Sequence, residues 1–268
     1  MFENPSIQAF VVSALTTLST GALQKAENPA RAVDDLMTLM GFEKLHYRAE
    51  AARIKHAANL DDFKKKLADE ITQIVLENIE NLKEPNLAIA GPALESAKFY
   101  LEDNELREMF AKLIASSMNK SKDEFSHPSF VEIIKQLDQL DAQNFNIISK
   151  FCQEQGFVPT VCYYTAEIGS DKPIKHIIDH VFISNLEQLN ITIQSSSLTN
   201  LERLGLIEID YGKNVADEYY HDLLHNSFVE QQNQELALEN KRILSRLGMI
   251  QLTLFGVRFS KVCLSDIS

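Results

Sequence analysis

The chain has 268 residues, of which 45% are hydrophobic and 24% charged, and its 9 Gly and 7 Pro leave room for long helices; this composition excludes a disordered chain. The formal net charge is −12, with 16 basic against 22 acidic residues up to residue 138 and 10 against 16 after it, so each part carries −6 and no basic domain is hidden. This balance argues against broad binding to DNA or RNA and against attraction to an anionic membrane surface.

Two features of the chain bear on its compartment. The cysteines are odd in number and widely spaced (Cys152, Cys162 and Cys263), which predicts free thiols in a reducing cytoplasm. The apolar run from Ala9 to Leu23 is diluted by Ser and Thr and follows no basic segment, unlike a signal peptide. We expect it to form a buried or partner-facing helix; a helix that touches a membrane is the alternative.

The first half of the chain has only helical patterns. Apolar residues between Leu60 and Leu82 recur every three or four positions, which places them on one face of a long helix. The clearest amphipathic pattern runs from Leu106 to Met118. Three further helices are expected: one over Ala32–Met40, one that starts at Gly91-Pro92, and one that Pro128 opens and that runs to Leu137. We therefore predict an all-helical region over residues 1–138.

The second half, residues 139–268, mixes helices with strands. Helices are expected over 141–155, 173–189, 195–204 and 256–264. Strands are expected over 158–168, 206–211 and 249–254. Gly205 separates a short helix from the strand that follows, and this order of helix, tight turn and two strands is the layout of a winged helix-turn-helix. The expected fold is mainly α, an N-terminal helical region followed by a winged-helix-like α/β unit with a helical insertion.

The insertion, residues 213–248, is too long for a simple wing. We expect it to hold one further helix, roughly Asn226–Leu247, which is rich in Glu and Gln. A helix of this composition is a candidate surface for contacting another protein.

Three blocks of the sequence resemble the abortive infection alpha family of bacteria and mobile elements. They stand in the family's order and are "IAGPALESAKFYLEDNELREMFAKLIASSMNKSKDEFSHPSFVEIIKQLDQLDAQ" (89–143), "SLTNLERLGLIEI" (197–209) and "QLTLFGVRFSKVC" (251–263). The resemblance implies a role in bacterial defence against phage. It brings no catalytic residue, because none is established for the family. The insertion at 213–248 departs from the family's pattern, so no contact through the wing is carried over.

Two pairs of histidines stand four residues apart, His176 with His180 and His221 with His225. On a helix, each pair would project from one face, which makes it a weak candidate for binding zinc. Neither pair has the Glu that follows the first His in a protease-type HExxH motif, and the sequence fixes no third ligand. We therefore predict no metal site and no cofactor, and expect ordinary surface or capping histidines.

No arrangement of residues recommends a catalytic site. The sequence lacks a GxxxxGK[ST] phosphate loop, a GxGxxG after a strand and a GxSxG elbow. We expect His127 to close a loop and cap a helix, with a functional role as the alternative. Carboxylates between Glu102 and Glu108 surround a helix start, where the helix dipole favours negative charge. We therefore assign no catalytic residue and favour a protein that is not an enzyme.

The helix over 195–204 has the place of a DNA-reading helix, and Thr199, Asn200 and Arg203 are its candidate contact residues. A DNA-reading helix usually presents several basic or amide side chains, but this helix has one arginine and lies in residues 139–268, which carry a net charge of −6. Protein interaction is therefore the favoured role.

The function expected is anti-phage defence of the abortive infection type, exerted through a phage protein, a host protein or a second copy of the chain. The alternatives are a winged-helix transcriptional regulator that binds DNA and an effector with a hidden hydrolase or metal site, or one that acts at a membrane. Nothing in the sequence indicates a small-molecule ligand.

Overall fold

The computed structural model describes residues 50–182 and 191–264 of the chain. The helix expected over Ala32–Met40 and the apolar run from Ala9 to Leu23 lie outside these ranges. The described part is mainly helical, as predicted, and carries one antiparallel four-stranded sheet. It divides into two compact units: the residues up to Gln139 with those from Arg258 onward form unit 1, and Leu140–Val257 form unit 2.

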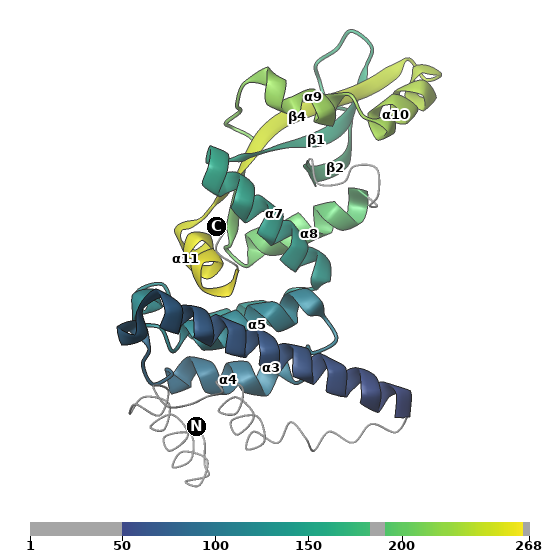
Figure 1. Ribbon diagram of the computed structural model, residues 1–268. Coiled ribbons are helices and arrows are strands. Elements are labelled where there is room, and N and C mark those ends of the chain that lie inside the picture. The colour runs from purple at the N-terminus through teal and green to yellow at the C-terminus, as the bar shows by residue number, and fades with distance from the viewer. Residues whose placement is uncertain (1–49, 183–190, 265–268) are drawn as a thin grey trace. The chain divides into compact units, whose positions relative to one another are not determined.

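Unit 1 is built from helices, which pack side by side in Figure 1. Up to residue 139 its elements are α3 (Glu50–Asn78), η3 (Ile79–Asn81), α4 (Leu87–Ala97), α5 (Asn104–Ser116), η4 (Lys120–Lys122) and α6 (Ser129–Ile134). The last helix of the chain, α11 (Leu254–Cys263), adds its residues from Arg258 onward.

The two predicted amphipathic helices, α3 and α5, supply much of the core of unit 1. Phe63 and Leu67 of α3 and Phe110 of α5 are fully buried, as their helical spacing predicts. Asp103 caps α5, because its carboxylate accepts a hydrogen bond from the amide of Leu106 at 3.0 Å. Burial of these large side chains is the main force that holds the helices together.

The expectation that Gly91-Pro92 starts a helix is wrong, because α4 begins earlier and contains Pro92. Asn86 is the N-cap, and its side chain accepts a hydrogen bond from the amide of Ala88. This capping signal sets the start of the helix, and a proline close to that start removes few helical hydrogen bonds. The long helix also ends earlier than Leu82, at Asn78, whose extended backbone caps η3.

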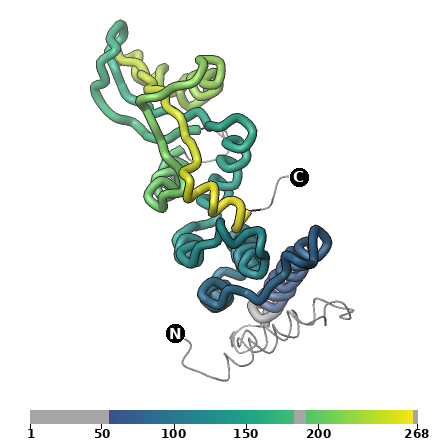
Figure 2. The backbone as a smooth tube through the Cα atoms, turned by 90° about the vertical axis from the view of Figure 1, so that its left-hand side faces the viewer, coloured from purple at the N-terminus to yellow at the C-terminus, as the bar shows by residue number. Residues whose placement is uncertain are grey.

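Unit 2 contains the sheet. In chain order its elements are α7 (Gln139–Gln155), β1 (Val158–Glu167), β2 (Lys175–Val181), α8 (Ile191–Arg203), β3 (Ile207–Asp210), η5 (Asp217–Tyr220), α9 (His221–Leu224), α10 (Ser227–Ala237), β4 (Lys241–Leu252) and the start of α11. The strand order is β2-β1-β4-β3. Strands β1 and β4 pair along ten residues, from Val158↔Ile250 to Glu167↔Lys241, and they run side by side in Figures 1 and 2.

The two faces of this sheet have different neighbours. Val161 and Tyr163 of β1 enter an apolar core with Tyr220, Leu223 and Val229, which come from η5, α9 and α10. Alternation along a strand places Thr160, Cys162 and Tyr164 on the opposite face. Helices α7 and α8 are joined by a buried hydrogen bond from the Asn144 amide to the Ser197 hydroxyl at 3.0 Å.

Two predictions for unit 2 are wrong. The segment 173–189, expected to be helical, contains strand β2, which pairs with β1 from Thr165↔Lys175 to Val161↔Val181. Pairing with a neighbouring strand here overrides the local pattern.

The second wrong prediction is the insertion helix Asn226–Leu247, because α10 ends at Ala237 and β4 begins at Lys241. The chain reverses at Asn240, whose φ of 57° lies in the left-handed region that asparagine tolerates better than most residues. The insertion is therefore only partly helical.

Candidate functional site

A cluster of polar side chains lies on the sheet of unit 2, on the face opposite to Tyr163. We call it the tyrosine–histidine cluster. It comprises Cys162 and Tyr164 of β1, His176, Asp179 and His180 of β2, Tyr211 after β3, and Arg246 of β4. These residues lie far apart in the sequence, and the strand pairing brings them together.

Tyr211 crosses the sheet to reach the far strand. Its ring passes so close to Gly248 that a Cβ there would lie 2.5 Å from Cδ1 of Tyr211 and 2.9 Å from the Asp210 carbonyl oxygen. Only glycine leaves this passage open. At its end, the Tyr211 hydroxyl accepts a hydrogen bond from the backbone amide of His180 at 3.0 Å and lies 3.1 Å from Nδ1 of the same residue.

His180 combines an unusual backbone with a partly buried ring. Its φ of 55° lies in the left-handed region, which is costly for a side chain of this size and persists only where surrounding contacts enforce it. Burial lowers the pKa of the imidazole, against the opposing charge of Asp179. The ring is therefore neutral at pH 7, and it stacks on Tyr211 with the ring centroids 5.9 Å apart.

The inner groups of the cluster keep their protons. Cys162 is buried, and burial raises the pKa of its thiol. Burial also raises the pKa of Tyr211, and the nearby Cys162 adds to that rise. A thiol is nucleophilic as the thiolate, so Cys162 does not have the environment of a catalytic cysteine.

The outer groups of the cluster are open to solvent. Nε2 of His176 lies 2.8 Å from Oδ1 of Asp179, and both side chains are close to half exposed. Tyr164 meets His176 edge to face at 5.3 Å, and the Arg246 guanidinium lies 5.7 Å from the centre of the Tyr211 ring. This rim therefore presents hydrogen-bond donors and acceptors to solvent.

The two predicted histidine pairs have different surroundings. His176 and His180 lie on a strand, so the expectation that they share a helix face is wrong. They face different partners within the cluster, namely Asp179 and Tyr211. His221 starts α9 and His225 follows it, with their rings 5.0 Å apart. In residues 50–182 and 191–264, no three His, Cys, Asp or Glu side chains are grouped to hold a metal ion.

The other sequence candidates make contacts within the protein. Nδ1 of His127 lies 2.6 Å from the Ser129 hydroxyl and 3.1 Å from the Ser129 amide, which is a capping geometry at the start of α6. The Thr199 hydroxyl of α8 donates to the carbonyl of Ser195 at 2.9 Å.

Asn200 and Arg203, also on α8, are linked to one another and to α7. The Asn200 amide donates to Asp141 at 2.7 Å, and the Arg203 guanidinium donates to the Asn200 carbonyl oxygen at 2.7 and 3.1 Å. The polar groups that would read a base edge are therefore held by this chain's own acceptors.

The sequence singles out neither Tyr211 nor Gly248, the glycine that the Tyr211 ring passes. A glycine inside a strand often marks a close approach of another part of the chain, so Gly248 was the available signal. Nothing in the sequence indicates that Tyr211 is the group that approaches it.

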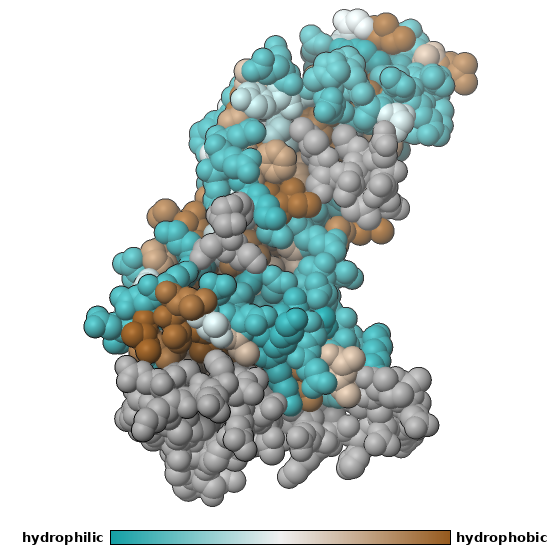
Figure 3. Space-filling model, viewed as in Figure 1, coloured by the Kyte–Doolittle hydropathy of each residue, from teal (hydrophilic) through white to brown (hydrophobic). Residues whose placement is uncertain are grey.

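Unit 2 also exposes a small apolar surface at one end of its sheet. Ile168 and Ile174, which flank the turn between β1 and β2, are each 55% exposed, and Leu238 after α10 is 91% exposed. A hydrogen bond from the Ile168 amide to the Asn240 carbonyl at 3.1 Å ties the two turns together. We call these three residues the apolar tip; the face drawn in Figure 3 mixes hydrophilic and hydrophobic residues over the described part of this unit.

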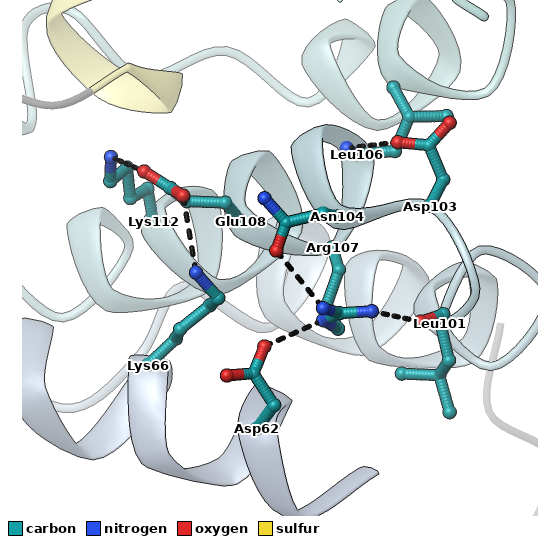
Figure 4. Close-up of polar contacts among 9 residues, drawn as sticks. All are labelled: Asp62, Lys66, Leu101, Asp103, Asn104, Leu106, Arg107, Glu108 and Lys112. Carbon is teal, nitrogen blue, oxygen red and sulfur yellow. Dashed lines mark hydrogen bonds and ion pairs between the residues drawn. The ribbon is translucent and has the colours of Figure 1, made fainter. Parts of the chain in front are cut away.

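Unit 1 contains a network of charged residues between α3 and α5 in which Arg107 and Lys112 are buried and their charged partners are partly exposed (Figure 4). The Arg107 guanidinium donates to Asp62 at 2.9 Å, to Asn104 at 3.0 Å and to the Leu101 carbonyl.

Beside this network, Glu108 accepts from Lys112 at 2.5 Å and from Lys66 at 3.2 Å. Burial acts to raise the pKa of Glu108, but the hydrogen bonds and charges of the two lysines outweigh it and lower the pKa to about 2.

The fold and these sites define a mainly helical protein whose sheet carries a polar cluster with protonated inner groups. The abortive infection alpha family model matches residues 55–263, which include both units, and the chain belongs to this family. No curated protein and no solved structure matches the chain. Within the described ranges, no helix is both long and apolar enough to cross a membrane.

Proposed function

We propose that this chain is a bacterial anti-phage defence protein of the abortive infection type, which acts in the cytoplasm by contacting another protein. The observation that carries the proposal is the family match over residues 55–263. The family name supplies the biological role, and the surfaces of unit 2 support protein contact as the mode of action.

The apolar tip is the surface proposed to make the contact. Ile168, Ile174 and Leu238 each expose an aliphatic side chain at the same end of the sheet, and exposed apolar patches mark interaction sites. Among the seven charged residues at 167–175 and 238–242, four are basic and three acidic, so the tip carries +1 in a chain of −12. The partner that fits is a protein with an exposed apolar patch inside an acidic rim.

The tyrosine–histidine cluster supports binding over chemistry. Its thiol and inner phenol keep their protons, as the raised pKa values of Cys162 and Tyr211 indicate. A hidden hydrolase would need an activated nucleophile, and this environment disfavours one.

Within unit 2, the motif formed by α8, β3 and β4 is proposed to be winged-helix-like. Helix α8 is followed by Gly205, whose φ is 70°, and then by the antiparallel pair β3 and β4. We propose that this motif is a scaffold and does not read DNA, because Asn200 donates a hydrogen bond to Asp141 and Arg203 donates one to Asn200.

The test is a phage challenge of bacteria that express the protein, at low and high ratios of phage to cells. We expect survival at the low ratio and collapse of the culture at the high ratio. The double variant Ile174→Glu with Leu238→Glu is expected to abolish protection, because it places two charges on the apolar tip. Leu254→Glu is the matched control, because Leu254 is also exposed (87%) and lies outside the tip.

The outcomes separate the candidate mechanisms. Protection lost with the tip variant and kept with Leu254→Glu supports the proposed contact. Protection that survives the tip variant but is lost with Arg203→Ala, together with operator binding by the wild type, would identify a DNA-binding regulator and overturn the proposal. Absence of protection across a broad phage panel would contradict the defence role itself.

A further inference from the structure

Unit 1 contains a polar hollow of about 340 Å³, separate from the surfaces considered so far. Its lining from α3 follows helical spacing, with Glu70, Gln73, Ile74 and Glu77. Its other lining residues come from α5 onward and are Lys112, Ala115, Ser116, Asn119, Lys122, Lys261, Val262 and Leu264. The volume suits a small metabolite, at the lower end of the range for ligand sites.

The acidic and the basic residues that line this hollow come from different segments of the chain. Both acidic lining residues, Glu70 and Glu77, come from α3. All three basic lining residues come from other segments: Lys112 from α5, Lys122 from η4, and Lys261 from α11. The hollow therefore has one acidic wall and one basic wall.

Interactions of the chain fix the basic wall in place. Lys112 is 5% exposed and pairs with Glu108, which Lys66 also contacts, so two lysines share one carboxylate. The Lys122 ammonium donates to the carbonyl of Lys261 at 3.0 Å, and the Lys261 ammonium lies 4.0 Å from the centre of the Phe125 ring.

Two uncharged side chains, Cys263 and Ser116, lie next to the basic wall and add no charge to it. Cys263 beside Lys112 is fully buried, and burial raises the pKa of its thiol well above the ordinary value, so it adds no negative charge. The Ser116 hydroxyl donates to the Val262 carbonyl at 3.0 Å, which links α5 to α11 behind the hollow. The wall is built before any ligand arrives, as a recognition site requires.

We propose that this hollow binds a small dipolar metabolite, with a phosphate at the lysine wall and amino or hydroxyl groups at the glutamate wall. Ammonium groups favour phosphate oxygens, and carboxylates accept hydrogen bonds from amines and hydroxyls. Such a ligand satisfies both walls, whereas a simple anion leaves the two glutamates opposed to it. The proposed contact at the apolar tip does not depend on this site.

The test is calorimetric titration of the full-length protein with glucosamine 6-phosphate, glucose 6-phosphate, inorganic phosphate and glucosamine. We expect glucosamine 6-phosphate to bind most tightly, and inorganic phosphate and glucosamine most weakly. Lys122→Gln with Lys261→Gln should weaken its binding at least about tenfold, because two charge-assisted contacts are lost. Lys64→Gln with Lys65→Gln removes the same charge from α3 outside the hollow and should leave binding unchanged.

The glutamate wall has its own variant. Glu70→Gln with Glu77→Gln should reduce the preference for glucosamine 6-phosphate over glucose 6-phosphate, since that preference arises from the amine. Circular dichroism on every variant shows that the fold is kept.

The proposal is overturned if no probe binds at millimolar concentration, or if the two lysine pairs weaken binding equally, which would indicate attraction by net charge alone. A defence failure in the phage challenge leaves these titrations unaffected, so the two proposals fail separately.

Discussion

Replacing Gly248 with alanine tests whether the passage of Tyr211 across the sheet organises the tyrosine–histidine cluster. The added Cβ would lie 2.5 Å from Cδ1 of Tyr211 and 2.9 Å from the Asp210 carbonyl oxygen, so the ring has to move. When it moves, its hydroxyl leaves the backbone amide of His180, which it meets at 3.0 Å. We therefore expect Gly248→Ala to destabilise unit 2 and to release β2 at His180.

The size of the effect follows from three contributions. Overpacking costs about 1–3 kcal/mol. An amide left without its partner costs about 1–3 kcal/mol. Alanine in place of glycine within a strand stabilises the folded state by about 0.5–1 kcal/mol, which offsets part of these losses. Taken at the middle of each range, the net loss is about 3 kcal/mol. Tyr211→Phe, which keeps the ring and removes the hydroxyl, should lose about 1–2 kcal/mol.

Urea unfolding followed by circular dichroism measures the loss, and amide hydrogen exchange at His180 measures the local release. The decisive comparison places Gly248→Ala in a Tyr211→Ala background, where no ring remains to be displaced. The second substitution should then cost about 1 kcal/mol, so the pair couples by about 1–3 kcal/mol. Additive losses, or unchanged exchange at His180 in Gly248→Ala, would refute the reasoning.

Three further predictions follow from buried groups. Arg107→Ala should cost about 2–4 kcal/mol in urea unfolding, because Asp62 and two other acceptors lose their donor, whereas Lys55→Ala, at an exposed pair, should cost less than about 1 kcal/mol; similar losses would contradict the network in Figure 4. Glu108 has its pKa lowered to about 2, so its stabilising contribution is complete above about pH 4.5 and disappears as the pH falls toward 2; Glu108→Gln should flatten stability against pH in that window, and an unchanged slope would contradict this. Burial raises the pKa of all three thiols, so alkylation at pH 8 should be slow in the native protein and fast in urea; equal rates in both would contradict it.

The helices of unit 1 were predictable because their signal is local. Apolar residues at helical spacing from Leu60 to Ile74 and from Leu106 to Ile114 are buried on α3 and α5, whereas Ile79, beyond the end of α3, is 42% exposed. What the sequence does not reveal is which charged residues enter the interior. Arg107 and Lys112 are buried because α3 supplies Asp62 and because Glu108 lies one turn away, and only the first of these facts requires the fold.

The strands of unit 2 were harder to predict because their signal depends on partners. β1 and β3 were anticipated from β-branched and alternating residues. The sequence pattern at β2 predicts a helix. Its seven residues form a strand because they pair with β1. The tyrosine–histidine cluster depends on that pairing, so its membership could not be derived from spacing, although its two β2 histidines were singled out for a different reason.

The insertion at 213–248 is part of the sheet's construction. Only the last four residues of β4 pair with β3, whereas β1 pairs with β4 along ten residues, of which those from Lys241 to Gly248 belong to the insertion. In the far half of the sheet, which has the apolar tip at its end, the insertion therefore supplies the edge strand that pairs with β1. Deleting Asn226–Leu247 would remove most of β4 and leave β1 paired with β2 alone over most of its length, so a loss of defence in that deletion would report unfolding of unit 2. Point substitutions at Ile174 and Leu238 leave every strand pair in place, which makes them the direct test of a contact at the tip.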